Sequence, residues 1–181
     1  PNSEPTLKFI DFKLGNVCNL KCRICGSWSS SKWAQEEIDY ETAIGKDNPV
    51  ARKQLKDGGW PKRNPQFFED LKEDLKHVEY FEFTGGEPFM IKDHFKILMH
   101  CVEKGYAKNI DIHYNTNGTQ LPPQEIFDLW SCFKHVEVAF SIDDVGEQFE
   151  YQRHPANWRE VNANLVKFKE RRTPNMDFQI C

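Results

Sequence analysis

Short apolar runs alternate along the chain with longer segments in which apolar residues recur every three or four positions. The short runs predict β-strands, and the longer segments predict amphipathic helices. The expected strands are residues 7–14, 79–84, 109–116, 135–143 and 176–181. The expected helices are residues 29–41, 65–78, 92–104, 122–133 and 158–170. Residues 44–65 are rich in Lys, Gly, Pro and Asp, which predicts an irregular insertion between two helices.

The regular alternation of strand and helix predicts parallel strands joined by right-handed crossovers. These strands are apolar on one face only: in the fourth, Val136 and Val138 flank Glu137. Strands that are covered by helices on both faces are apolar on both. The pattern therefore predicts an α/β fold with a partial, TIM-like (β/α)6 barrel of about five strands, and argues against a doubly wound sheet. The polar positions of the third strand, which would face the barrel interior and contact substrate or one another, are Asp111, His113 and Asn115.

The chain has 181 residues, 39% of them hydrophobic and 29% charged, which suffices for one domain with a sizeable core. We therefore expect residues 1–181 to be a single core domain. Because the chain begins at Pro1 without a methionine, we also expect it to be a fragment or a processed product. A net charge of -4 argues against a broad nucleic-acid-binding surface, so nucleic acid is not the expected partner, though the charge does not argue against one small RNA substrate. The lack of a long apolar stretch argues against a membrane.

The six cysteines do not have the regular spacing of a disulfide framework. Three are clustered, and the other three, Cys101, Cys132 and Cys181, are scattered. Cys101 and Cys132 fall on the apolar sides of expected helices, where buried free thiols are the ordinary interpretation. This usage of cysteine predicts a reducing, cytoplasmic setting.

The clustered cysteines, Cys18, Cys22 and Cys25, have the spacing C-x3-C-x2-C directly after the first expected strand. A structural zinc site or a fully ligated iron–sulfur cluster normally takes four protein ligands. Three ligands on one loop leave one metal position open for a small molecule. Taken alone, the triplet also fits a zinc site that borrows a distant His or Cys.

A second motif, Thr84-Gly85-Gly86-Glu87-Pro88, follows the second expected strand, so both motifs belong to the carboxyl edge of the sheet, where barrels of this kind place their chemistry. Together the two motifs resemble the radical SAM superfamily. The flanking Asp11-Phe12-Lys13 and Gly26-x-Trp28 are most similar to its twitch and SPASM types. The family core usually has six strand–helix units, so we expect a truncated core whose flanking segments, with any auxiliary cluster, lie outside this chain.

The resemblance implies that the three cysteines hold a 4Fe–4S cluster and that S-adenosylmethionine chelates its open iron. It implies reductive cleavage of S-adenosylmethionine to a 5′-deoxyadenosyl radical, which removes hydrogen from a substrate. For the twitch and SPASM types, that substrate is a peptide or protein. An electron donor such as flavodoxin or ferredoxin is implied as a further partner.

The resemblance also implies residues that contact S-adenosylmethionine. Ile24 would lie near the adenine, Gly85 and Gly86 would allow close backbone approach, and Glu87 would accept hydrogen bonds from the methionine ammonium group.

Further contacts come from the later strands. Ser141 and Asp143 would serve the ribose or the carboxylate, Arg153 would pair with the methionine carboxylate, and Asn117 is a candidate from the third strand. Without the resemblance, Ser141 and Asp143 fit a helix cap or turn equally well, and Arg153 fits a surface ion pair.

Two other functions stay open at this point. One is a radical SAM enzyme that acts on tRNA or a small metabolite, which a basic RNA-binding extension would favour. The other is a non-catalytic module that binds zinc or an iron–sulfur cluster without the radical chemistry.

Overall fold

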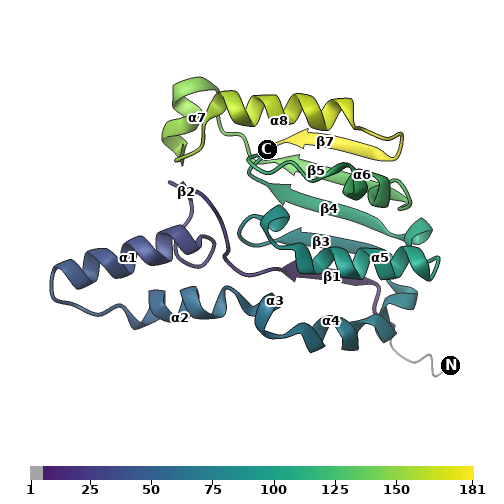
Figure 1. The fold of residues 1–181 in the computed structure, drawn as a ribbon, viewed down its shortest axis with the longest axis horizontal. Helices are drawn as coiled ribbons and strands as arrows, with labels where there is room; N and C mark the ends of the chain where they lie inside the picture. Colours follow the sequence, from purple (N-terminus) through teal and green to yellow (C-terminus); the bar gives the residue numbers. More distant parts are fainter. Residues whose placement is uncertain (1–5) are drawn as a thin grey trace.

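The computed structural model describes residues 6–181, and its main feature is a sheet of five parallel strands in the order β1-β3-β4-β5-β7 (Figure 1). These strands are β1 (Phe9–Lys13), β3 (Tyr80–Thr84), β4 (Asp111–Thr116), β5 (His135–Phe140) and β7 (Met176–Ile180). Two short strands, β2 (Lys21–Cys22) and β6 (Arg153–His154), pair antiparallel outside this sheet. The predicted α/β class is confirmed, and the open parallel sheet agrees with a partial barrel.

The helices follow the strands in the expected alternation. They are α1 (Ser31–Ala43), α2 (Pro49–Asp57), α3 (Trp60–Arg63), α4 (Pro65–Leu71), α5 (Phe95–Glu103), α6 (Gln124–Trp130), α7 (Gly146–Gln152) and α8 (Trp158–Glu170). Short 3-10 turns are η1 (Lys72–His77), η2 (Pro88–Met90), η3 (Lys92–His94) and η4 (Ala107–Asn109). Within residues 6–181, no helix has the length and apolar character needed to cross a membrane.

The prediction of an irregular insertion at residues 44–65 is wrong, because α2 and α3 occupy most of it. The Asn48 side chain accepts a hydrogen bond from the Ala51 amide at 2.9 Å and so caps α2. Pro49 and Pro61 stand in the first turns of their helices, where proline is tolerated. The same residues that suggested a loop therefore start helices, and α2 packs side by side with α1 (Figure 1).

The hydrophobic core lies between the sheet and the helices that cover one of its faces. Phe83 of β3 is at its centre, with its ring 5.2 Å from that of Phe12 and 4.8 Å from that of Tyr114. Helices α4, α5, α6 and α8 close this core from outside with Phe68, Leu98, Trp130 and Phe168. The alternation of buried and half-buried residues along β3 and β4 shows that only one sheet face is sealed in this way.

The other face of the sheet is polar and half-buried, as its alternating sequence predicts. Its central residues hydrogen-bond one another: His113 Nδ1 lies 2.7 Å from Glu137 Oε1, and Asn115 donates to Glu82 at 3.3 Å. These four side chains belong to three neighbouring strands, so they form one polar surface across the middle of the sheet.

The two scattered cysteines of the helices differ in their surroundings. Cys101 is fully buried in α5, as expected. The expectation that Cys132 is buried is wrong, because α6 ends at Trp130 and Cys132 lies exposed in the turn that follows. When the apolar spacing of a helix is extended beyond its last residue, it places the following residues on the wrong face.

Phe83→Ala tests the core. Removal of this buried ring between Phe12 and Tyr114 should lower the free energy of unfolding by about 3–5 kcal/mol, because it leaves a cavity. Phe9→Ala is the matched control, since Phe9 is 54% exposed and should change that free energy by less than about 1 kcal/mol. Urea denaturation followed by tryptophan fluorescence measures both, and equal effects would contradict this description of the core.

Candidate metal and cofactor site

The cysteine loop lies at the carboxyl edge of the sheet, toward which all five strand arrows point in Figure 1. Cys18 and Cys22 are buried, and Cys25 is half-buried. Strand β2, which contains Cys22, pairs with β6, so that Cys22 lies opposite Arg153. The loop is further fixed by the Trp33 indole of α1, which donates to the Cys22 carbonyl at 2.9 Å.

The three thiols interact electrostatically with one another. A hydrogen bond between Cys22 and Cys25 raises the pKa of Cys22 and lowers the pKa of Cys25. Burial raises the pKa of Cys18, whose Sγ accepts hydrogen bonds from the Leu20 amide at 3.4 Å and from Asn117 at 3.7 Å. Cys25 is thus the most acidic thiol of the loop, and it is also the most accessible.

This donor set fits an iron–sulfur cluster. Three thiols on one loop are soft ligands of the type that binds such clusters, and Arg153 Nη1 lies 3.7 Å from Cys22 Sγ, where its charge favours the thiolate. Of the three thiols, only those of Cys22 and Cys25 interact through a hydrogen bond, and within residues 6–181 no three His, Cys, Asp or Glu side chains have the geometry of a formed metal site. Ligation would therefore require the thiols to lose their protons and turn toward the metal.

The glycine turn after β3 packs against the backbone that leads into the cysteine loop. The Gly86 amide donates to the Gly15 carbonyl at 2.9 Å, and the Glu87 amide donates to the Val17 carbonyl at 2.8 Å. A Cβ atom on Gly86 would lie 2.1 Å from the Val17 carbonyl oxygen, and Gly85 has a φ of +116°. Both glycines are therefore needed for the contact with the chain's own loop, whatever else approaches them.

Glu87 is fully buried directly after this turn. Its Oε1 accepts from the Thr116 hydroxyl at 2.8 Å and from the Phe89 amide at 3.2 Å, and its Oε2 accepts from the Asn117 amide at 2.8 Å. Burial raises the pKa of Glu87 to about 7, and these three hydrogen bonds oppose that rise. The carboxylate holds the end of β4 against the cysteine loop; the prediction that it also receives an ammonium group stays a prediction.

Arg153 reaches the same site from β6, the strand that pairs with β2 of the cysteine loop. Its guanidinium forms an ion pair with Asp143, with Nε 2.7 Å from Oδ2 and Nη2 3.1 Å from Oδ1. Arg153 is buried, and Asp143 is partly exposed. Arg153 thus contacts both Asp143 and Cys22, so three of the residues selected from the sequence lie together.

The remaining selected residues lie around this centre. Ile24 projects from the cysteine loop and is 71% exposed. Ser141 is half-buried just beyond β5, and its amide donates to the Thr116 carbonyl at 2.8 Å. Asn117 is buried and also donates to Asn19 Oδ1 at 3.1 Å.

Sequence reasoning missed Thr116 and Asn19. Thr116 continues the buried row of Ile112 and Tyr114 in β4, and a polar side chain on a buried face signals a buried partner, here Glu87. Asn19 donates to Thr119 Oγ1 at 2.9 Å and so ties the cysteine loop to the turn after β4. No pattern in the sequence marks that contact.

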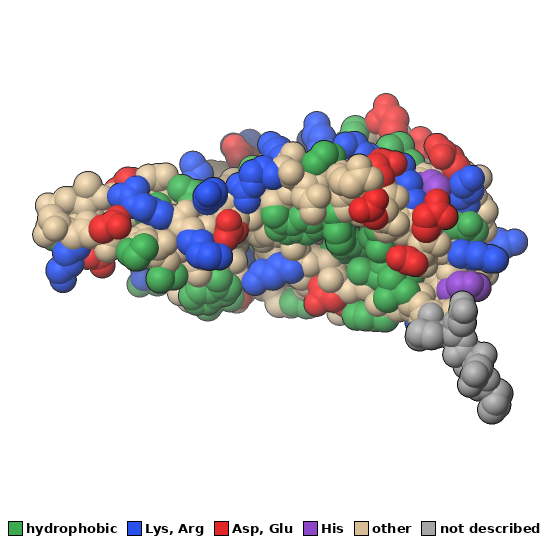
Figure 2. All heavy atoms as spheres, turned by 90° about the horizontal axis from the view of Figure 1, so that it is seen from below, with side chains coloured by type: hydrophobic (Ala, Val, Ile, Leu, Met, Phe, Trp, Pro, Cys, Tyr) green, Lys and Arg blue, Asp and Glu red, His purple; other side chains and the backbone are tan. Residues whose placement is uncertain are grey.

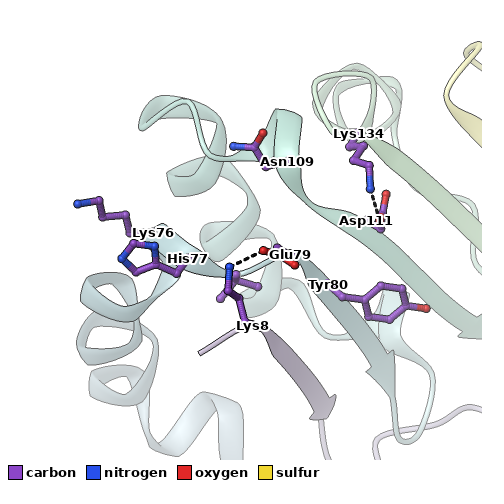
Figure 3. A pocket seen from close by; sticks show the side chains of 9 residues that line it. Lys8, Lys76, His77, Glu79, Tyr80, Asn109, Asp111 and Lys134 are labelled. Atoms are coloured by element: carbon purple, nitrogen blue, oxygen red, sulfur yellow. Dashed lines mark hydrogen bonds and ion pairs between the residues drawn. The ribbon is translucent and has the colours of Figure 1, made fainter. Parts of the chain in front are cut away.

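A large hollow lies at the opposite, amino edge of the sheet. Its volume is about 610 Å³, and Figure 3 shows its lining residues, with the ion pairs Lys8–Glu79 and Lys134–Asp111 across it. It contains no cysteine and no residue of the glycine turn. Size alone therefore does not identify the site, and the convergence of thiols, Glu87 and Arg153 at the carboxyl edge is the better guide.

A model of the radical SAM superfamily matches residues 12–180. Among solved structures, native anSMEcpe with bound AdoMet has 21% identity and a TM-score of 0.56, over 96% of this chain and 43% of that one. Streptococcus suis SuiB bound to precursor peptide SuiA has 16% identity and a TM-score of 0.54, over 97% of this chain and 32% of that one. The chain spans less than half of either structure, and the likeness shows the fold alone. A search of curated proteins finds no match to this chain.

Glu87→Gln tests the buried carboxyl. Its pKa is about 7 in the folded chain and 4.5 ordinarily, so the folded state binds the proton more tightly. The stability that Glu87 contributes is therefore full below about pH 4.5 and is lost as the pH rises through 7. The free energy of unfolding of the wild type minus that of the variant should fall by about 3 kcal/mol between about pH 4.5 and 8.

Urea denaturation of both proteins at several pH values measures this difference. Buried His94, whose pKa is lowered to about 3, shifts stability in the opposite direction, but it does so equally in both proteins and cancels. A difference that stays constant with pH would contradict the raised pKa of Glu87.

Proposed function

Because this chain belongs to the radical SAM superfamily, we propose that it is the core of a radical SAM enzyme in which Cys18, Cys22 and Cys25 hold a 4Fe–4S cluster beside S-adenosylmethionine. The observation that carries the proposal is the convergence of the three thiols with the glycine turn and Arg153 at one edge of the sheet. When bound, the cluster supplies one electron for cleavage of S-adenosylmethionine to a 5′-deoxyadenosyl radical, which abstracts hydrogen from the substrate.

The residues of the chain have distinct tasks in this proposal. Arg153 favours the thiolate form of Cys22 and presents its charge toward a carboxylate, while Asp143 holds the guanidinium in place. Exposed Ile24 offers an apolar surface for the adenine. Glu87 orients Asn117 and fixes the turn against the cysteine loop.

Ser141 completes the proposed set at the carboxyl end of β5. It lies half-buried in the strand-end layer that also contains Thr116, whose carbonyl accepts from its amide. A hydroxyl there can hydrogen-bond a ribose. Gly85 and Gly86 keep this layer free of side chains next to the loop.

We further propose a peptide or protein as the substrate, in contact with the polar sheet face. SuiB, one of the similar folds, was solved with a precursor peptide bound. Glu82, His113 and Glu137 offer donors and acceptors of the kind that peptide groups need. The electron would come from a carrier such as flavodoxin or ferredoxin, and the free thiols call for a reducing compartment such as the cytoplasm.

Cys22→Ala tests the proposal. The chain is reconstituted anaerobically with iron and sulfide, reduced with dithionite and supplied with S-adenosylmethionine, and 5′-deoxyadenosine is quantified. The variant should lose cluster and product together, because two thiolates cannot replace three. Cys132→Ser is the matched control: it removes an exposed thiol outside the loop and should retain both.

Retained product in Cys22→Ala would refute the proposed ligand set. Metal analysis tests the alternative of a non-catalytic module, since one zinc per chain without labile sulfide would indicate a zinc-binding module. A reconstituted wild-type chain with about four irons and no product would indicate a cluster-binding module without radical chemistry.

A further inference from the structure

The segment from Lys46 to Arg63, which contains α2 and α3, is strongly basic. It has six Lys and Arg against two Asp, a net charge of +4 in a chain whose total is -4. Three of the basic residues form ion pairs within the segment: Arg52 with Asp47, and Lys53 and Arg63 with Asp57. Figure 2 views the molecule from the side of α2, and toward the end that carries α1 and α2 it shows Lys and Arg side chains together with hydrophobic and some acidic ones.

This basic segment is connected to the cysteine loop through Asn16. The Asn16 amide donates to the Gly58 carbonyl at 3.3 Å, and its side chain donates to the carbonyls of Gln54 at 3.2 Å and Ser27 at 2.7 Å. Ser27 is two residues beyond Cys25. The Asn16 side chain therefore bridges the carboxyl end of α2 and the backbone that follows the last cysteine.

An aromatic cleft lies where the segment meets the loop. Trp28 and Trp60 line it together with Lys13 and Asp57, and its volume is about 270 Å³. Trp28 is 56% exposed, although it follows the cysteine loop by only three residues. An exposed tryptophan beside an apolar cleft whose lining includes two charged side chains, Lys13 and Asp57, has the composition of a protein-docking site.

The cleft does not open on the polar sheet face, where the substrate is proposed to lie. The Trp60 ring stacks on Phe68 at 5.8 Å, and Phe68 belongs to the core on the helix-covered side of the sheet. Trp60 also donates to the Lys13 carbonyl at 3.1 Å, which places the cleft beside the edge strand β1. A partner bound there would reach the cysteine loop from outside and leave the polar face free.

We propose that the basic segment and the Trp28–Trp60 cleft together dock an acidic one-electron carrier protein of the flavodoxin or ferredoxin class. The inference rests on the proposed function, because the carrier gives up one electron and the cluster held by the cysteines accepts it. Charge complementarity selects the carrier: the surface has excess positive charge, and an acidic partner is drawn to it over the otherwise negative chain.

The test uses Lys56→Glu/Lys62→Glu, which reverses two charges at exposed positions; within residues 6–181 neither side chain has an ion-pair partner. The matched control is Lys76→Glu/Lys108→Glu, the same charge change at exposed positions on the amino edge of the sheet. Calorimetry with a purified, acidic flavodoxin should give a dissociation constant about tenfold or more higher for the first pair and less than about threefold higher for the control.

A kinetic measurement accompanies binding. With reduced flavodoxin as the electron source, 5′-deoxyadenosine formation at low flavodoxin concentration should slow about tenfold in Lys56→Glu/Lys62→Glu, whereas with dithionite, which needs no docking, it should not change. Raising the salt concentration should weaken flavodoxin binding to the wild type and reduce the difference between wild type and variant. Circular dichroism of Lys56→Glu/Lys62→Glu and of the milder Lys56→Gln/Lys62→Gln checks that α2 and α3 remain folded.

The docking surface would be refuted if the wild type bound no flavodoxin, or if Lys56→Glu/Lys62→Glu and Lys76→Glu/Lys108→Glu lost flavodoxin affinity equally. It would also be refuted if Lys56→Glu/Lys62→Glu formed 5′-deoxyadenosine more slowly with dithionite as well, or if the wild type bound RNA in preference to flavodoxin. These outcomes differ from failure of the proposed function. A wild type that binds flavodoxin through this surface but forms no product with dithionite would count against the radical chemistry and leave the docking surface standing.

Discussion

The whole site depends on the hydrogen bonds made by one buried residue, Glu87. It accepts hydrogen bonds from Thr116 and Asn117 at the end of β4, while its own amide binds the Val17 carbonyl just before the first cysteine. One residue after β3 thereby fixes the loop after β1 and the turn after β4. The two glycines before it allow this approach, because a side chain at either would collide with the backbone that leads into the cysteine loop.

Much of the fold could be predicted because its pattern is local. Alternation of apolar and polar residues within β3, β4 and β5 identified the strands and the single sealed face. Residues 44–65 were misjudged because Pro49 and Pro61 look like loop residues, although helix starts accept proline as readily. Cys132 was misplaced because spacing does not reveal where a helix stops.

The site was only partly predictable for a related reason. The cysteines could be selected because they are adjacent in sequence and carry a distinctive chemistry. The contact of Arg153 with Cys22 joins residues 131 positions apart, and the pairing of β2 with β6 that produces it spans two residues in each strand. The bracing by Glu87 was likewise hidden, because a glutamate after a glycine turn gives no sign that it will be buried.

The open sheet has a consequence for handling the chain. β7 is an outer strand, and among the described residues no other strand pairs with its far side. In a preparation of these residues alone, exposed Ile180 and the outer backbone of β7 offer a template onto which a strand from another molecule can add. Each outer strand has one carbonyl that accepts from a side chain: Lys13 of β1 accepts from the Trp60 indole at 3.1 Å, and Met176 of β7 accepts from Arg172 at 2.6 Å. For a preparation of these 181 residues alone, self-association at high concentration would therefore proceed through the outer strands, and a charged or proline substitution in β7 would suppress it at that edge.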